Sequence, residues 1–78
     1  MSIVTTNLYD TLDAVPETER PAAKEAERLA AKATLAMRRN PAELYEASQA
    51  MERHQHRTGW RYLPSGQYRH RTRTDTTP

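Results

Sequence analysis

Small and apolar side chains recur with a helical period in the middle of the chain. From residue 22 to residue 39 there is no Gly or Pro, and Thr34 is the only β-branched residue. On a wheel of about 100° per residue, these side chains occupy one continuous arc. The arc consists of Ala22, Ala23, Ala26, Leu29, Ala30, Ala33, Ala36 and Met37. The pattern predicts a helix over 18–39, with Thr18 as its N-cap and Pro21 in its first turn, where a missing N–H costs nothing.

A second long helix is predicted directly after Asn40. Asn40-Pro41-Ala42-Glu43 is a helix-start signature, in which Asn40 caps the helix and Pro41 takes its first position. The helix should run to about Arg57 and stop near Gly59, because glycine readily adopts the left-handed conformation that ends helices. The very short link between the two helices predicts an antiparallel hairpin. Its packing interface is expected to consist of Ala26, Leu29, Ala33, Ala36, Met37, Leu44, Ala47 and Met51.

The first residues of the chain show a weaker pattern. Residues 1–6 are expected to form a short mobile lead, and Asn7 can cap a short helix that Pro16 ends. Its apolar face, at positions i, i+4 and i+7, would consist of Leu8, Leu12 and Val15. We therefore expect a short helix ahead of the helical hairpin.

The end of the chain is typical of a β-hairpin. Two segments rich in Arg and aromatic residues, 60–63 and 67–71, flank Pro64-Ser65-Gly66, which suits a three-residue hairpin loop. In that register Trp60 lies opposite His70, Tyr62 opposite Tyr68 and Arg61 opposite Arg69. An isolated hairpin is marginal in water, so its aromatic side should pack on the helices or on a partner. Residues 72–78 are expected to be disordered.

Composition limits the size of the core. Leu, Ile and Val together number nine among 78 residues, there is no Phe, and 11 residues are Ala. The predicted fold is mainly α: a short helix plus an antiparallel helical hairpin, followed by a short basic β-hairpin or an extended tail. We divide it into a small helical body, residues 1–58, and a basic aromatic tail, residues 59–78. With so few large aliphatic side chains, part of the fold is expected to depend on a partner or on self-association.

Charge divides the chain at nearly the same place. Residues 1–52 carry six basic and nine acidic side chains, whereas residues 53–78 carry six Arg, one Asp and all three His. This asymmetry is the largest compositional signal in the chain. Within the body, a basic stripe on the predicted helix over 18–39 is either a solvated face or a docking surface around Leu35. The stripe consists of Lys24, Arg28, Lys32 and Arg39.

Several kinds of chemistry are excluded. The absence of Cys rules out disulfides, thiol nucleophiles and cysteine zinc sites, and two Gly are too few for a phosphate-cradling loop. His54 and His56 are two residues apart on a helix, so they cannot chelate one metal, and His54 is expected at the boundary of the apolar stripe. We therefore expect no enzyme, no cofactor and no metal. No apolar run exceeds three residues, so we expect no membrane segment and a cytoplasmic location.

The tail carries the candidate binding residues. The planar guanidinium group of Arg can donate paired hydrogen bonds to a phosphate, and Tyr or Trp rings can stack on bases. The predicted set for nucleic acid or another partner is Arg53, Arg57, Trp60, Arg61, Tyr62, Tyr68, Arg69, Arg71 and Arg73. Two other interpretations remain open. The aromatics could only hold the hairpin on the helices while Arg provides solubility, or the ligand could be an acidic protein surface.

Two functional hypotheses follow. The first is a small non-enzymatic accessory protein of a larger protein or nucleoprotein complex, with the body docked on protein or on a second copy and the tail on DNA or RNA phosphates. The alternative is a small inhibitor or adaptor that folds onto an acidic surface of a larger host protein. A structural subunit that threads its tail between neighbours in a large assembly also fits the pattern.

Overall fold

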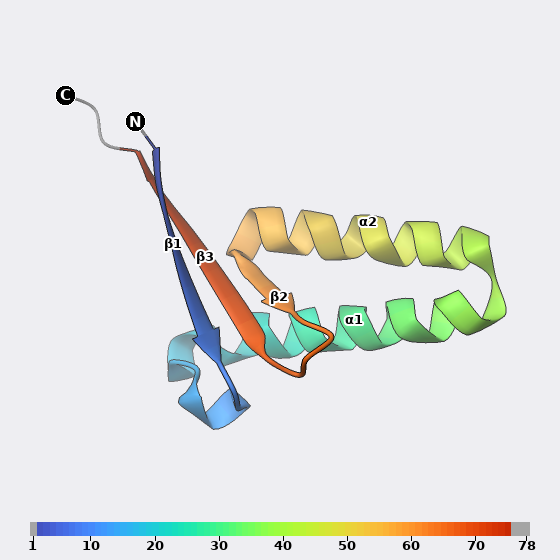
Figure 1. Ribbon diagram of the computed structural model, residues 1–78, viewed down its shortest axis with the longest axis horizontal. Coiled ribbons are helices and arrows are strands. Elements are labelled where there is room, and N and C mark those ends of the chain that lie inside the picture. Colours follow the sequence, from blue (N-terminus) through green and yellow to red (C-terminus); the bar gives the residue numbers. More distant parts are fainter. Residues whose placement is uncertain (1, 76–78) are drawn as a thin grey trace.

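A helical hairpin covers one face of a small antiparallel sheet in the computed structural model, which describes residues 2–75 and the side chains of residues 3–72 (Figure 1). In chain order the main elements are β1 (Ser2–Tyr9), α1 (Arg20–Arg39), α2 (Pro41–Thr58), β2 (Trp60–Tyr62) and β3 (Tyr68–Asp75). Two one-turn 3₁₀ helices, Leu12–Ala14 and Glu17–Glu19, connect β1 to α1. The described chain is mainly helical, as predicted.

Local sequence signals set most of the helix boundaries. The backbone N–H of Ala42 donates to Asn40 Oδ1 at 3.0 Å, and Pro41 opens α2. Gly59 closes α2 with a φ of 83°, in the left-handed region. The prediction that Thr18 caps α1 is wrong. The helix begins at Arg20 with Glu19 in the N-cap position, because a 3₁₀ turn takes up the residues before it.

The sheet has the order β1-β3-β2, with both pairs antiparallel. β1 pairs with β3 along its whole length, from Ser2 opposite Asp75 to Tyr9 opposite Tyr68. β2 pairs with the first residues of β3 in the register that the three-residue loop predicts, with Trp60 opposite His70. Figure 1 shows the far ends of β1 and β3 running past the helices, so the two strands form an arm that projects from the body.

The structure corrects the predictions for both ends of the chain. Residues 2–9 form a strand rather than a mobile lead and the start of a helix, and residues 72–75 belong to β3 rather than to a disordered tail. The β-branched run Ile3–Thr6 suits a strand, but the partner that satisfies its backbone lies more than sixty residues away. No local pattern reveals such a pairing. The predicted disorder of residues 76–78 lies outside the described residues.

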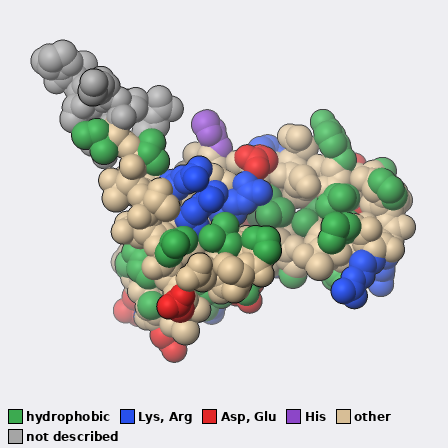
Figure 2. All heavy atoms as spheres, in the orientation of Figure 1, with side chains coloured by type: hydrophobic (Ala, Val, Ile, Leu, Met, Phe, Trp, Pro, Cys, Tyr) green, Lys and Arg blue, Asp and Glu red, His purple; other side chains and the backbone are tan. Residues whose placement is uncertain are grey.

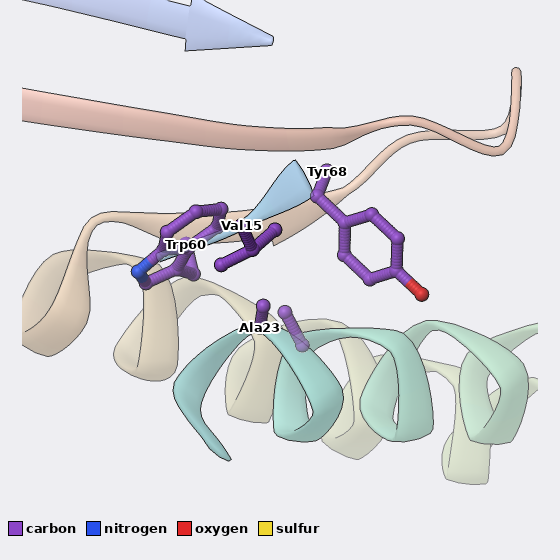
Figure 3. Packing of buried hydrophobic residues seen from close by; sticks show 5 residues of the cluster. Val15, Ala23, Trp60 and Tyr68 are labelled. Carbon is purple, nitrogen blue, oxygen red and sulfur yellow. The ribbon is translucent and has the colours of Figure 1, made fainter. Parts of the chain in front are cut away.

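The core lies between the sheet and the first half of α1. Trp60 and Val15 are each 1% exposed, and Figure 3 shows both beside Ala23 of α1. The buried cluster consists of Val15, Ala23, Ala26, Trp60 and Tyr68, with Tyr9, Leu12, Ala22 and Tyr62 packed around it. Small Ala side chains let the sheet approach α1 closely. The sheet therefore covers the N-terminal part of the Ala arc, including Ala26, which the sequence pattern assigns to the interface between the two helices.

The two helices pack through the rest of that arc. Of the predicted interface, Ala26, Leu29, Ala36 and Ala47 are buried, and Ala33, Leu44 and Met51 are half-buried. Met37 is 65% exposed, so its assignment to the interface is wrong. It lies near the end of α1 that the sheet does not reach. His54 is buried rather than at a boundary, because its Nε2–H donates to the carbonyl oxygen of Ala22 at 2.8 Å and joins α2 to α1.

Candidate functional site

The alternation of side chains along β2 and β3 sorts the tail residues onto two faces of the sheet. Neighbouring residues of a strand point to opposite faces, and residues paired across strands share a face. Arg61 and Arg69 are such a pair, and Arg71 lies on the same face further along β3. The opposite face, toward the helices, carries Trp60, Tyr62, Tyr68 and His70. Residue types that alternate in the sequence are therefore separated in the structure.

The aromatic face serves packing. The Trp60 ring stacks on His70 with centroids 4.6 Å apart and contacts Tyr9 at 5.6 Å. Tyr62 meets Tyr68 edge-on at 5.0 Å. Trp60 and Tyr68 are buried in the core, so in this structure their rings are not exposed for base stacking and instead pack the hairpin on the helices. Any ligand of the sheet must be recognised by other groups.

The Tyr68 hydroxyl gives this packing a pH dependence. Burial, together with the hydrogen bond that the hydroxyl donates to Glu27, raises the pKa of Tyr68 to about 12. The unfolded chain titrates near 10, so between pH 10 and 12 the folded chain holds more protons. We therefore expect the free energy of unfolding to fall by about 2 kcal/mol as the pH rises through this window. Urea titrations of the wild type and of Tyr68→Phe at pH 9 to 12 measure it. An equal fall in both proteins would contradict the assignment.

The opposite face, which we call the outer face, collects positive charge. Arg61, Arg69 and Arg71 lie side by side on it, and Figure 2 shows Lys and Arg side chains gathered over the strands. The Nε of Arg69 is buried and has no hydrogen-bond partner among the described residues. Burial, followed by the charges of Arg71 and Arg61, lowers the pKa of Arg69. Like charges in such a cluster destabilise a sheet unless an anion sits between them.

One acidic side chain offsets part of this charge. Arg61 NH1 donates to Glu52 Oε1 at 2.7 Å and to Gln55 Oε1 at 2.8 Å, which ties the sheet to α2. Glu52 is mostly exposed, so water screens the pair and its contribution to stability is small. Its role is to orient Arg61. Arg69 and Arg71 keep no such carboxylate partner among the described side chains.

The remaining predicted Arg residues fall in three different places. Arg57 lines a hollow of about 600 Å³ together with Arg71, between the end of α2 and β3, and the carboxylates of Glu19 and Glu52 line the same hollow. Arg53 instead lines a hollow on the helical hairpin with Lys32 and Arg39, away from the cluster. The side chain of Arg73 lies outside the described ones. The predicted set is therefore brought together only in part.

Sequence reasoning missed the contribution of β1 to the outer face. Val4, Thr6 and Leu8 share this face with the Arg residues, since Thr6 is paired with Arg71 and Leu8 with Arg69. The available signal was the β-branched run Ile3–Thr6, which favours a strand over a mobile lead. The outer face therefore combines a basic half with an uncharged half.

Residues 2–75 contain no cluster of three His, Asp or Glu side chains that could hold a metal ion. No helix within the described range is long and apolar enough to cross a bilayer. An apolar groove of about 490 Å³ runs between α1 and the β2–β3 turn, lined in part by Met37, Leu63 and Pro64.

Comparison with protein-family models, with curated proteins and with solved structures finds no match to this chain, so its function must be argued from the outer face and the groove.

Proposed function

We propose that this chain is a small non-enzymatic accessory protein of a nucleoprotein assembly, and that the outer face of its sheet binds nucleic-acid phosphates. One observation carries the proposal. Arg61, Arg69 and Arg71 lie together on one face, and the buried Nε of Arg69 has no hydrogen-bond partner among the described residues. A fold that holds like charges together gains stability when an anion joins them.

The arrangement favours contact with the backbone of a nucleic acid over recognition of its bases. Guanidinium forks donate paired hydrogen bonds to phosphate oxygens. Base readout would need exposed rings or polar side chains that reach base edges. The rings of Trp60 and Tyr68 are buried, and the neighbours of the Arg residues on β1 are Val4, Thr6 and Leu8. Binding is therefore expected to depend on salt and little on sequence.

Salt dependence provides the test. With three phosphate contacts, the logarithm of affinity for mixed-sequence duplex DNA should fall with the logarithm of salt concentration with a slope of about −3. The double variant Arg69→Ala/Arg71→Ala should flatten that slope by about two units. Fluorescence anisotropy of a labelled duplex between about 20 and about 200 mM salt measures both slopes.

A matched control separates local contacts from net charge. Arg38→Ala/Arg39→Ala removes the same two charges from exposed positions at the end of α1. It should change the slope by less than about half a unit, because screened charges act weakly beyond about 10 Å. If the two double variants flatten the slope equally, the outer face is not the binding site. Circular dichroism of both variants checks that the fold is retained.

A second candidate function rests on the apolar groove between α1 and the β2–β3 turn. Its lining includes Tyr62, Leu63 and the exposed Met37, which together suit a protein partner better than a phosphate. In that case the chain is an adaptor or inhibitor, and the Arg face meets carboxylates of an acidic host surface. Titration with poly-glutamate at low salt distinguishes the two. Binding to it without binding to DNA or RNA would favour the second function.

A further inference from the structure

β1 is an open edge of the sheet. The strand order β1-β3-β2 leaves β1 paired on one side only, over all eight of its residues. The other side presents a row of backbone donors and acceptors that no described residue of the chain pairs. Such an edge is a template for another strand.

The edge lacks the features that protect monomeric proteins. Ser2–Tyr9 contains no charged residue, no Pro and no Gly, and four of its residues are β-branched. Edge strands that stay unpaired in solution usually carry Lys, Pro or a bulge. In this sheet the charges lie on β2 and β3 instead. Nothing in the sequence of β1 opposes a further strand.

Large apolar side chains are exposed along the same strand. Ile3, Val4 and Leu8 are 54%, 56% and 53% exposed. Val4 and Leu8 lie on the outer face, and Ile3 lies on the opposite face, so both faces of the edge are apolar. A partner strand must therefore offer apolar side chains on both of its faces.

We propose that a second copy of this chain pairs with β1 in antiparallel orientation, around a two-fold axis through Thr6. With a two-fold axis normal to the sheet, the two residue numbers of every pair add up to the same value. That value is even, because paired residues lie on the same face of the sheet and residues on one face of a strand are two positions apart. Centring at Thr6 places Val4 opposite the partner's Leu8 and Ile3 opposite the partner's Tyr9. All the large apolar side chains of the edge are then matched.

Neighbouring registers do not achieve this match. A two-fold axis through Thr5 would set Ile3 opposite the partner's Asn7, and Leu8 opposite the partner's Ser2. The Thr6 register also pairs threonine with threonine at the axis, a favourable cross-strand combination. A second copy fits better than a charged partner, since β1 has no charge to complement. One strand edge is smaller than a standard interface, so the dimer should form with a concentration dependence.

The dimer would join the two sheets into one of six strands, in the order β2-β3-β1 followed by the partner's β1-β3-β2. A two-fold axis normal to the sheet keeps both outer faces on the same side. Arg61, Arg69 and Arg71 of both copies would then form one continuous basic surface. The pairing itself depends only on β1 and stands apart from any ligand of that surface.

Disulfide trapping tests the register. The chain has no Cys, so Thr6→Cys introduces a single thiol, opposite its own copy across the axis. Residues directly opposite in an antiparallel pair lie about 4.5–5.5 Å apart at Cα, within the range of a disulfide. Thr5→Cys is the matched control, because its nearest copy is a diagonal neighbour at about 7–8 Å. Under mild oxidation, the Thr6→Cys dimer should form at least about tenfold faster than the Thr5→Cys dimer.

Sedimentation equilibrium of charge variants gives an independent readout. The wild type should approach twice the chain mass of 9.0 kDa as concentration rises. Val4→Glu/Leu8→Glu puts like charges opposite each other across the axis, while each Glu lies beside an Arg position of β3. It should fold and stay monomeric. Val4→Lys/Leu8→Glu puts opposite charges there and should keep the dimer. A wild type of single-chain mass at every concentration, with equal trapping of the two Cys variants, would overturn the proposal.

Discussion

Trp60→Ala is expected to remove a large share of the stability of the fold. The indole ring is 1% exposed and contacts Tyr9 and His70 while packing over α1. Truncating a buried Trp removes apolar burial and leaves a cavity, at a cost of about 3–5 kcal/mol. A domain of this length has a total stability of only about 4–12 kcal/mol. The loss should lower the melting temperature by tens of degrees, since about 4–8 °C corresponds to 1 kcal/mol in a small domain.

Tyr45→Ala is the control for this change. Tyr45 is also a large aromatic residue, but it is 68% exposed on α2. Its truncation should change the free energy of unfolding by no more than about 0.5 kcal/mol. Thermal melts of both variants, followed by circular dichroism at 222 nm, make the comparison. If Trp60→Ala melted within a few degrees of Tyr45→Ala, Trp60 would not be the centre of the core.

Gly59→Ala should destabilise the fold by about 3 kcal/mol, for two separate reasons. Gly59 has a φ of 83°, a conformation that costs an L-residue about 1–2 kcal/mol. A methyl group there would also overlap the backbone carbonyl oxygen of Arg71 and lie 3.1 Å from the His70 ring. The backbone cannot yield easily, because Arg71 N–H donates to the Gly59 carbonyl at 3.0 Å. The variant should therefore loosen β3 from the end of α2.

Gly66→Ala measures the backbone cost alone, so the difference between the two variants gives the steric part of the effect. Gly66 has a φ of 90°, so alanine bears a similar backbone cost there. Among the described residues, its methyl group would meet only the Tyr62 hydroxyl, at 3.7 Å, which is an ordinary contact. We expect a loss of about 1–2 kcal/mol. Urea denaturation of the two variants gives the difference. Equal losses of unfolding free energy would show that the close approach of β3 to Gly59 adds nothing to the cost of the Gly59→Ala substitution.

Local signals accounted for the helical hairpin. Asn40 and Pro41 start α2 through groups that act within one turn, and Gly59 ends it through its own backbone freedom. The same holds for the pairing of β2 with β3, since Pro64 and Gly66 in a short loop leave few registers open. These elements were predictable because the residues that decide them are neighbours in the sequence.

The sequence predicted which side of α1 is buried, but not which elements pack against it. The Ala arc of α1 was recognised from its periodicity, yet three of its eight residues, Ala22, Ala23 and Ala26, belong to the cluster around Trp60 and Tyr68. A stripe of small side chains favours close approach by any flat apolar surface, whether helix or sheet. Only the tertiary structure decides whether a helix or the sheet packs against a given part of the stripe.

Tertiary structure alone decided β1 and, through it, the candidate site. Ile3 to Tyr9 become a strand because β3, at the other end of the chain, supplies the hydrogen bonds that hold them. Strand pairing then separated Arg61, Arg69 and Arg71 from the rings of Trp60 and Tyr68, although the two kinds of residue are mixed in the sequence. Side-chain direction in a strand depends on which face the protein buries. That choice is made by long-range packing, which a local pattern of residues does not contain.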